Sequence, residues 1–326
     1  TSTVGEDFLL EFANITNATT QANFLASRQC HAICINEHAT PPHLHNRLAQ
    51  TLQSFMPPNT PPPKLLLSPL DTSTSKRQGG VGFITPHSTH IVPLSPITPK
   101  FQQAHDAGRA QLAYFPYNHN SFFIVANLYC YTGGHTCSQA ASKTDTLFST
   151  LFDELLHHPS CPTIITTDLN ADPPDIPTLQ HHLEQQAWTD IGAIANAFGE
   201  QAHAPTCKSY NSTLPTRRDY IFANAAAFPL IHAFRVLPYD DLPVHSLLQL
   251  QIKAKPPHTT YTKASPHTDF AALFEHNISQ AISSTPDSNP QQIRKDHLHK
   301  LHSAVNSFLA HINPQTPGSS YHSNNI

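Results

Sequence analysis

One short apolar stretch that ends in an acid and an amide constrains this chain more than any other. Residues 163–170 read T-I-I-T-T-D-L-N, so β-branched residues lead into Asp168 and Asn170. β-Branched side chains favour a buried or half-buried strand, and Pro173 and Pro174 end regular structure soon afterwards. Side chains two apart in an extended segment point to the same side. The stretch therefore predicts a strand end that presents Asp168 and Asn170 to one cleft. Taken alone, such a stretch is more often a strand followed by a plain Asp/Asn turn.

The charge of the 326-residue chain limits how it can hold an anionic partner. Charged residues make up 12% of the sequence, and 18 Lys and Arg against 22 Asp and Glu give a net charge of −4. The usual charged share is about 25%. No broad basic field is expected, so a nucleic acid would have to be held locally, or with the help of partly protonated members of the 24 histidines.

The cysteines and the apolar runs indicate an intracellular protein, nuclear or cytoplasmic. The six cysteines form no C-x-x-C pair, and most lie within or beside apolar runs, which favours reduced, buried thiols. No apolar run approaches the roughly 18 residues of a membrane helix, and the first residues do not resemble a signal peptide. Because the sequence lacks an initial Met, we expect a processed piece or a fragment of a longer polyprotein.

Hydrophobic patterning predicts many short strands and a few amphipathic helices up to residue 252. Strands are expected at residues 8–15, 31–36, 64–67, 79–85, 90–94, 111–115, 121–129, 163–168, 217–224, 231–237 and 245–252. Helices are expected at residues 16–28, 41–55, 138–156 and 178–187. After Lys255, Pro256 and Pro257 the pattern turns polar and helical. We therefore predict one domain over 1–254 and a polar helical extension over 255–326 with a disordered C-terminal end.

Five of the predicted strand ends carry polar side chains suited to chemistry. They are Asn14, Glu37, Asp168 with Asn170, Asp219 and His245. Each alone is an ordinary turn or surface residue. Their order along the chain, and the residues around them, are more specific than any one of them.

This order resembles the endonuclease/exonuclease/phosphatase family, which includes deoxyribonuclease I, the apurinic/apyrimidinic endonucleases and the endonuclease domains of non-LTR retrotransposons. The resemblance covers residues 6–252 and begins with four motifs. These are F-A-N-I-T-N at 12–17 with Asn14, I-C-I-N-E-H at 33–38 with Glu37, G-G-V-G-F at 79–83, and N-L-Y-C-Y at 127–131 with Tyr129.

The remaining motifs follow in the family's order. T-T-D-L-N at 166–170 resembles G-D-F-N, and P-T-C at 205–207 with T-R-R-D-Y-I-F at 216–222 resembles the family's threonine and its R-I-D-Y-I segment. L-P-V-H-S at 242–246 stands where the family has S-D-H. The T-R-R-D-Y-I-F wording and the helical tail are most like retrotransposon endonucleases. The resemblance implies a four-layered α/β sandwich of the deoxyribonuclease I type.

The resemblance also implies an activity, a Mg²⁺-dependent endonuclease that nicks DNA, with Mn²⁺ as a substitute. A hard divalent ion relieves negative charge on the phosphate during attack by water. The implied roles are metal binding by Glu37 with Asn14, water activation by Asp168, phosphate binding by Asn170, a His245–Asp219 pair, donation by Tyr129 and nucleic-acid contact by Thr206. Separately, Arg217 and Arg218 precede the Asp219 strand near the expected cleft, where they could contact the DNA backbone; a solvated strand start is an equal alternative. The implied partners are DNA and a fused reverse transcriptase domain, with no membrane.

Two departures from the family keep other functions open. Val244 replaces the aspartate of S-D-H, which contributes to the metal site in the family, although Asp240 or Asp241 could compensate. Thr132 stands where repair enzymes often have asparagine, so a preference for abasic sites is not expected. One alternative is a phosphomonoesterase or phospholipase-type hydrolase of the same fold, although the W-C-D-R-I wording of inositol phosphatases is absent. The other is a catalytically decayed domain that docks nucleic acid or protein.

Overall fold

The computed structural model describes residues 7–71, 79–86, 89–118, 121–208, 214–242 and 244–253. All of them belong to the first of two units into which the chain divides, Thr1–His258. The predicted extension over 255–326 lies outside the described residues.

The first sheet has six strands in the order β11-β12-β1-β2-β4-β3. They are β1 (Phe8–Asn14), β2 (Ala32–Asn36), β3 (Lys64–Leu67), β4 (Val81–Thr85), β11 (Ile231–Leu237) and β12 (Leu247–Ile252). β1 and β2 run parallel, and each of the other neighbouring pairs is antiparallel.

The second sheet has six strands in the order β5-β6-β7-β8-β10-β9. They are β5 (Val92–Leu94), β6 (Ala110–Asn118), β7 (Ser121–Tyr129), β8 (Thr163–Asp168), β9 (Trp188–Asp190) and β10 (Asp219–Asn224). Here β7 and β8 form the parallel pair, and the other neighbours are antiparallel.

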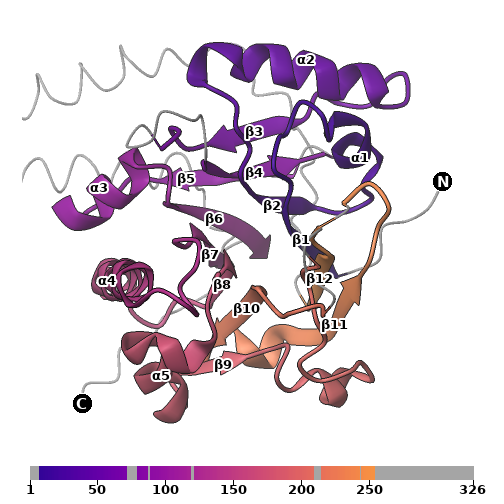
Figure 1. The fold of residues 1–326 in the computed structure, drawn as a ribbon. Coiled ribbons are helices and arrows are strands. Elements are labelled where there is room, and N and C mark those ends of the chain that lie inside the picture. Colours follow the sequence, from indigo (N-terminus) through magenta and orange to yellow (C-terminus); the bar gives the residue numbers. More distant parts are fainter. Residues whose placement is uncertain are drawn as a thin grey trace, which may run out of the picture. The chain divides into compact units, whose positions relative to one another are not determined.

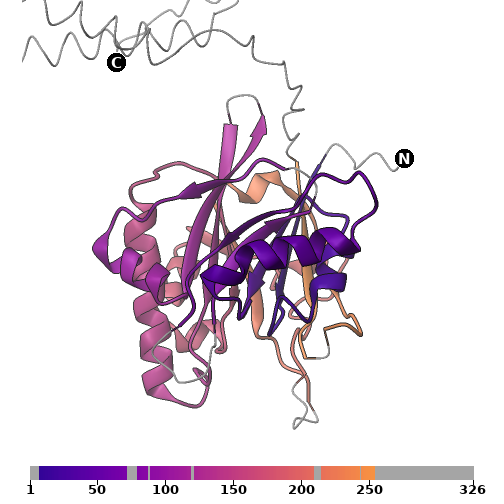
Figure 2. The same cartoon turned by 90° about the horizontal axis from the view of Figure 1, so that it is seen from above.

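Helices cover the outer faces of both sheets. The α-helices are α1 (Ala22–Ser27), α2 (His45–Phe55), α3 (Pro99–Asp106), α4 (Ser138–Leu155) and α5 (Pro177–Glu184). Short 3₁₀ turns occur at η1 (Pro42–Leu44), η2 (Pro173–Asp175), η3 (Ala195–Phe198) and η4 (Phe228–Leu230). Helices α1 and α2 pack on the first sheet, and α3, α4 and α5 pack on the second (Figures 1 and 2). The four layers confirm the predicted α/β sandwich.

Strand periodicity explains how the two sheets face each other. In β1, Phe8, Leu10 and Phe12 lie in the core between the sheets. In β8, Ile164 faces this core, whereas Ile165 packs under the helices. Alternate side chains of a strand point to opposite faces. The polar residues that end β1 and β8, Asn14 and Asp168, therefore continue the inward-facing series at the open edge of the sandwich.

The topology brings the predicted site residues to one edge of the sandwich. The parallel strands β1 and β2 end side by side, with Asn14 level with Asn36, and β7 and β8 end with Tyr129 level with Asp168. β10 runs the opposite way, so its first residue, Asp219, pairs with Asp168. Carboxyl ends of parallel strands thus meet the amino end of an antiparallel strand.

The elements that differ from the sequence prediction include the first helix and helix α3. The helix expected over 16–28 is limited to α1, because Asn17 Oδ1 accepts hydrogen bonds from the Thr19 and Thr20 N–H groups and holds a turn before it. Helix α3 was not predicted. It begins with Thr98 as an N-cap, whose hydroxyl accepts from Phe101 N–H, and with Pro99 in its first turn. Both are helix-start signals, but its short polar sequence has weak periodicity.

Among the described residues, no helix is both long and apolar enough to cross a membrane.

Candidate active site

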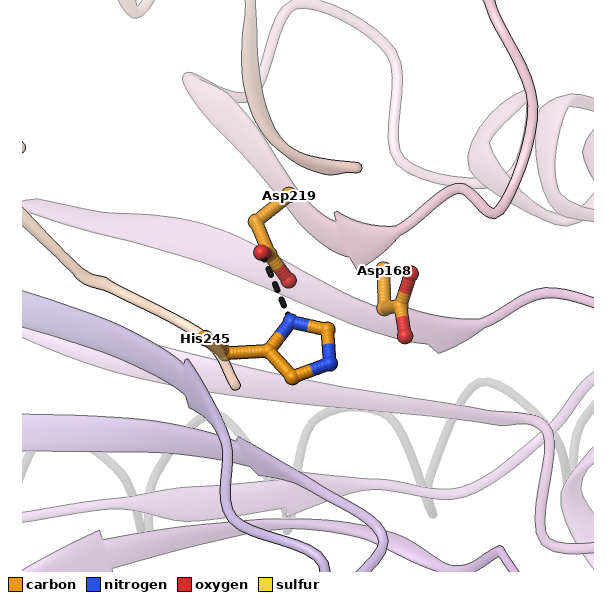
Figure 3. Close-up of side chains that lie close together, drawn as sticks. All are labelled: Asp168, Asp219 and His245. Atoms are coloured by element: carbon orange, nitrogen blue, oxygen red, sulfur yellow. Dashed lines mark hydrogen bonds and ion pairs between the residues drawn. The ribbon is translucent and has the colours of Figure 1, made fainter. Parts of the chain in front are cut away.

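A histidine–aspartate pair lies at the centre of the site. His245 Nδ1 is 2.9 Å from Asp219 Oδ2, and the Asp219 carboxylate is fully buried (Figure 3). Burial by itself lowers the pKa of His245, but the charges of Asp219, Asp168 and Glu37 outweigh it and raise the pKa to about 9. The imidazole is therefore protonated at neutral pH, and Nε2 can donate a hydrogen bond to an anion.

Asp168 is a buried acid beside this pair. Burial and the neighbouring Asp219 charge raise its pKa to about 7. Among the described residues, its Oδ1 atom has no hydrogen-bond partner. A buried carboxylate oxygen without a partner is costly, so it is suited to accept a proton from a ligand or to bind a cation.

Asn14 joins the two sheets at the site. Its side-chain amide donates to Glu37 Oε1 at 2.8 Å and to Asp168 Oδ2 at 2.8 Å. Its own carbonyl oxygen accepts from Thr16 N–H at 3.1 Å. Asn14 therefore holds two carboxylates from different sheets close together, against their mutual repulsion.

Glu37 has a backbone fixed by its neighbours. It lies at φ 58°, a region that non-glycine residues seldom occupy. The next residue, His38, is fully buried, and a Cβ on Gly80 would come within 2.4 Å of its Nε2. Burial and the neighbouring His45 lower the pKa of His38 to about 3, so this imidazole is neutral. The G-G turn thus packs directly behind the candidate metal-binding glutamate.

Thr206 positions the start of β10. Its hydroxyl oxygen accepts from the N–H groups of Arg218 at 3.0 Å and Asp219 at 2.9 Å. These bonds fix the backbone from which the Asp219 carboxylate projects. In this structure Thr206 is buried, so it serves the site through Asp219.

Tyr129 lies at the end of β7 with its hydroxyl near the acids. Burial and the Glu37 carboxylate raise its pKa, so it stays a protonated donor. The Arg109 guanidinium lies 4.8 Å from the Tyr129 ring centroid and 4.5 Å from that of Tyr131. Arg109 is itself buried and forms an ion pair with Asp71. A cation between two rings fixes where the Tyr129 hydroxyl can lie.

Asn170 also occupies a left-handed backbone conformation, with φ 52°. Its Nδ2 is buried and has no hydrogen-bond partner among the described residues. An unsatisfied amide donor two residues from Asp168 is suited to a phosphate oxygen.

The sequence reasoning missed the residues behind this site. Arg109 with Asp71 was not predicted, nor was Asn127. The Asn127 amide donates to the carbonyls of Ile35 at 2.9 Å and Gly82 at 3.0 Å, and so joins the second sheet to the first. Two sequence features could have indicated them: Arg109 immediately precedes an apolar strand, and Asn127 begins the N-L-Y-C-Y motif.

The two arginines predicted to bind nucleic acid both lie against acids of the protein. Arg217 forms a two-pronged ion pair with Asp190 and stacks 4.2 Å from the Tyr220 ring centroid. Arg218 Nη1 is 4.0 Å from Asp172 Oδ1. Arg217 is therefore held in place by its partner, and contact of either arginine with DNA stays a prediction.

Val244 contributes backbone to the site. Its carbonyl accepts from Lys208 N–H at 2.8 Å, and Ser246 N–H donates to Thr206 O at 2.7 Å. This short antiparallel pairing sets the position of His245, which lies opposite Cys207. The aspartate expected from the family pattern is thus replaced by an apolar side chain without loss of the backbone arrangement.

A divalent cation is implied by the resemblance, and the donor atoms fit one. Asp168, Asp219 and His245 form one cluster with polar atoms within 4.8 Å of one another, and because the imidazole is protonated the carboxylates are the groups that can face a cation. Like Asp168 Oδ1, Asp219 Oδ1 is buried without a hydrogen-bond partner among the described residues. Together with Glu37, these carboxylates form an oxygen-rich set of the kind that Mg²⁺ or Mn²⁺ prefers.

Neither a protein-family model nor a curated protein matches the sequence. Solved structures do match. The apurinic/apyrimidinic endonuclease LMAP from Leishmania major has a TM-score of 0.61 and 11% identity, over 76% of this chain and 88% of that one. A 3′-5′ exonuclease from Neisseria meningitidis has a TM-score of 0.55 and 16% identity, over 75% and 99%.

A third match is the endonuclease domain of TRAS1, a telomere-specific non-LTR retrotransposon. It has a TM-score of 0.50 and 12% identity, over 76% of this chain and 99% of that domain. At such identities a structural likeness shows a shared fold, and activity has to be argued from the site. The matches confirm the fold that the sequence motifs predicted.

Proposed function

We propose that this chain, which has the fold of the endonuclease/exonuclease/phosphatase proteins, is a metal-dependent phosphodiesterase that nicks DNA and leaves a 3′-OH. One observation carries the proposal. The His245–Asp219 pair lies beside Asp168, which Asn14 in turn links to Glu37. Residues from 14 to 245 thus converge on one edge in an arrangement suited to a phosphate ester.

The donors and acceptors of the site match a phosphodiester and an attacking water. Asp168, with a pKa of about 7, can take the proton of the water as its oxygen bonds to phosphorus. His245 and Asn170 offer N–H groups to the phosphate oxygens. The bond to the 3′ oxygen breaks, and Tyr129, still protonated, can donate to this leaving oxygen. Each such contact is typically worth about 10²–10³-fold in rate.

When bound, a divalent cation supplies positive charge that stabilises the developing phosphorane. Glu37, with Asn14 beside it, is the residue that would hold it, which leaves Asp168 to take the proton of the water.

A role in retrotransposition is the finer form of the proposal. The sequence motifs closest to retrotransposon endonucleases, and the fold shared with the TRAS1 endonuclease domain, support it. In this form the substrate is chromosomal DNA, the protein acts in the nucleus, and a reverse transcriptase is fused to the chain. Among the described residues the Arg218 side chain forms one long ion-pair contact, with Asp172, so Arg218 is a better candidate for DNA-backbone contact than Arg217.

Nicking of supercoiled plasmid tests the proposal. The chain is assayed with Mg²⁺, with Mn²⁺ and with EDTA, beside His245→Ala. A matched control exists on β11, where His232 Nε2 lies 3.2 Å from Asp7 Oδ2 in a second His–Asp pair away from the site. Metal-dependent nicking that His245→Ala loses and His232→Ala keeps supports the proposal.

Absence of nicking with either metal, from folded protein, contradicts it. Release of phosphate from monoesters under the same conditions would then favour the phosphomonoesterase, and DNA binding without cleavage would favour the decayed docking domain.

A further inference from the structure

A cavity of about 460 Å³ opens beside His245, on the side of the Thr206 and Val244 segments. Its lining includes Thr206, Cys207, Lys208, Tyr239, Val244 and His245. Small-molecule sites measure roughly 300–1,000 Å³, so this space can take one nucleoside. We propose that it is a subsite for a nucleobase next to the scissile phosphate. The inference rests on the proposed function and names the part of the substrate that the site would recognise.

The aromatic wall of the cavity is held rigid from behind. The Arg28 guanidinium lies 4.8 Å from the Tyr239 ring centroid, and Phe24 meets the ring edge-on at 5.4 Å. Arg28 forms two hydrogen bonds with the buried Glu11 carboxylate, at 2.9 Å and 2.8 Å. Tyr239 remains partly exposed. A fixed ring loses little conformational entropy when a flat partner stacks on it, and every base offers a π-face.

The remaining walls also suit an uncharged ring with a phosphate at its rim. Pro205, Pro215 and Pro238 line the cavity with Leu242 and Val244. An acid at position 244 would place a charge in this wall, where the chain has an apolar side chain. Lys208, exposed at the rim, offers a cation for the backbone phosphate, and Asp240 offers an acceptor for a base edge.

A second and larger hollow, of about 650 Å³, fits this role less well. It is lined by Trp188 and Tyr220 and by the Asp190–Arg217 ion pair, whose charges already satisfy each other. Tyr220 packs on the outer face of the second sheet, whereas Asp219 faces inward. None of the residues placed in the catalytic arrangement lines it.

An abasic scan of DNA binding tests the subsite. Oligonucleotide duplexes that each carry one tetrahydrofuran in place of a nucleotide are titrated with the chain in EDTA, so that no cleavage occurs. We expect one position to lose affinity by roughly 5- to 150-fold, the range of base–aromatic stacking. Tyr239→Ala should abolish this position-specific loss, and Tyr239→Phe, which keeps the ring, should preserve it. Phe228→Ala removes an exposed aromatic residue beyond the opposite end of β10 and should change nothing.

A second variant leaves Tyr239 and its contacts with Arg28 in place. Val244→Phe would place a larger side chain in the lining of the cavity, and it should also abolish the position-specific loss while the chain stays folded. Val244→Ala, which enlarges the space, should preserve it.

The outcomes separate this inference from the proposed function. The subsite is wrong and the proposed function stands if plasmid is nicked but no single abasic position lowers the affinity for DNA. The same holds if plasmid is nicked and Tyr239→Ala and Val244→Phe leave the position-specific loss of affinity unchanged. If DNA is neither bound nor cut, both are wrong.

Discussion

Asp168 and Asp219 occupy directly paired positions on the antiparallel strands β8 and β10, and only Asp219 is hydrogen-bonded to the histidine. Two buried carboxylates this close cannot both ionise freely. His245 lies against Asp219, and burial together with the nearby Asp219 carboxylate raises the pKa of Asp168 to about 7. Asp168 is therefore the acid of the two that can exchange a proton at neutral pH.

This relationship predicts how metal binding depends on pH. Below about pH 7 Asp168 carries a proton in the metal-free chain, so a divalent cation must displace it. We expect the affinity for Mn²⁺ to fall by up to about tenfold per pH unit between pH 7 and pH 5, with proton release on binding. Calorimetry in buffers of different ionisation enthalpy measures both quantities. In Asp168→Asn the proton release should disappear; a constant affinity in the unmodified chain would contradict the prediction.

The His245–Asp219 pair predicts a pH-dependent contribution to stability. The folded pKa of His245, about 9, lies above its ordinary value of 6.5. The stabilisation is therefore complete below about pH 6.5 and is lost as the pH rises through about 9. In denaturant unfolding, the free energy of unfolding of the unmodified chain should exceed that of Asp219→Asn, and the difference should be larger at pH 6 than at pH 10. An equal difference at both pH values would mean that the pair is not charged.

Replacement of Arg109 should have a large effect on stability, although Arg109 is not proposed to contact the substrate. Its guanidinium is buried against Asp71 and between Tyr129 and Tyr131. Breaking a buried ion pair from one side typically costs roughly 3–5 kcal/mol, and Arg109→Met should lower the free energy of unfolding by about that amount. Arg235, whose side chain is 57% exposed, is the control, and Arg235→Met should change stability by less than about 0.5 kcal/mol.

Arg109→Lys tests positioning of Tyr129 separately from stability. Lysine keeps the charge but lacks the flat group that fits between two rings. We expect kcat for nicking to fall while KM changes little, because the Tyr129 hydroxyl loses its fixed position. If kcat is retained and only the melting temperature falls, the role of Arg109 is purely structural.

The strand series could be predicted because it depends on local sequence, whereas the roles of the site residues came from the order of the motifs and stay predictions. Ser121–Tyr129 is a strand with the predicted bounds, since β-branched and aromatic residues favour extended backbone. Polar residues such as Asn14 and Asp168 were visible because each follows an apolar run. Arg109 and Asp71 meet only through tertiary packing of segments 38 residues apart, and no periodicity reports such a contact. The ion pair that Asp190 forms with Arg217 was likewise hidden until β9 was placed beside β10.

Val244 is the position where the chain departs furthest from the motif it otherwise follows, and its replacement gives the last prediction. Val244→Asp would add a carboxylate beside His245, within the field of Asp168 and Asp219. Additional negative charge attracts a divalent cation, so the Mg²⁺ concentration for half-maximal nicking should fall by about tenfold. The same charge should raise the pKa of Asp168 further and move the onset of activity to higher pH. Val244→Asn introduces a side chain of nearly the same shape as aspartate but without its charge. It should leave the Mg²⁺ concentration for half-maximal nicking and the pH at which activity begins close to those of the unmodified chain. If the aspartate and asparagine variants behave alike, charge at this position does not govern metal binding, and Glu37 with Asn14 suffices to hold the ion.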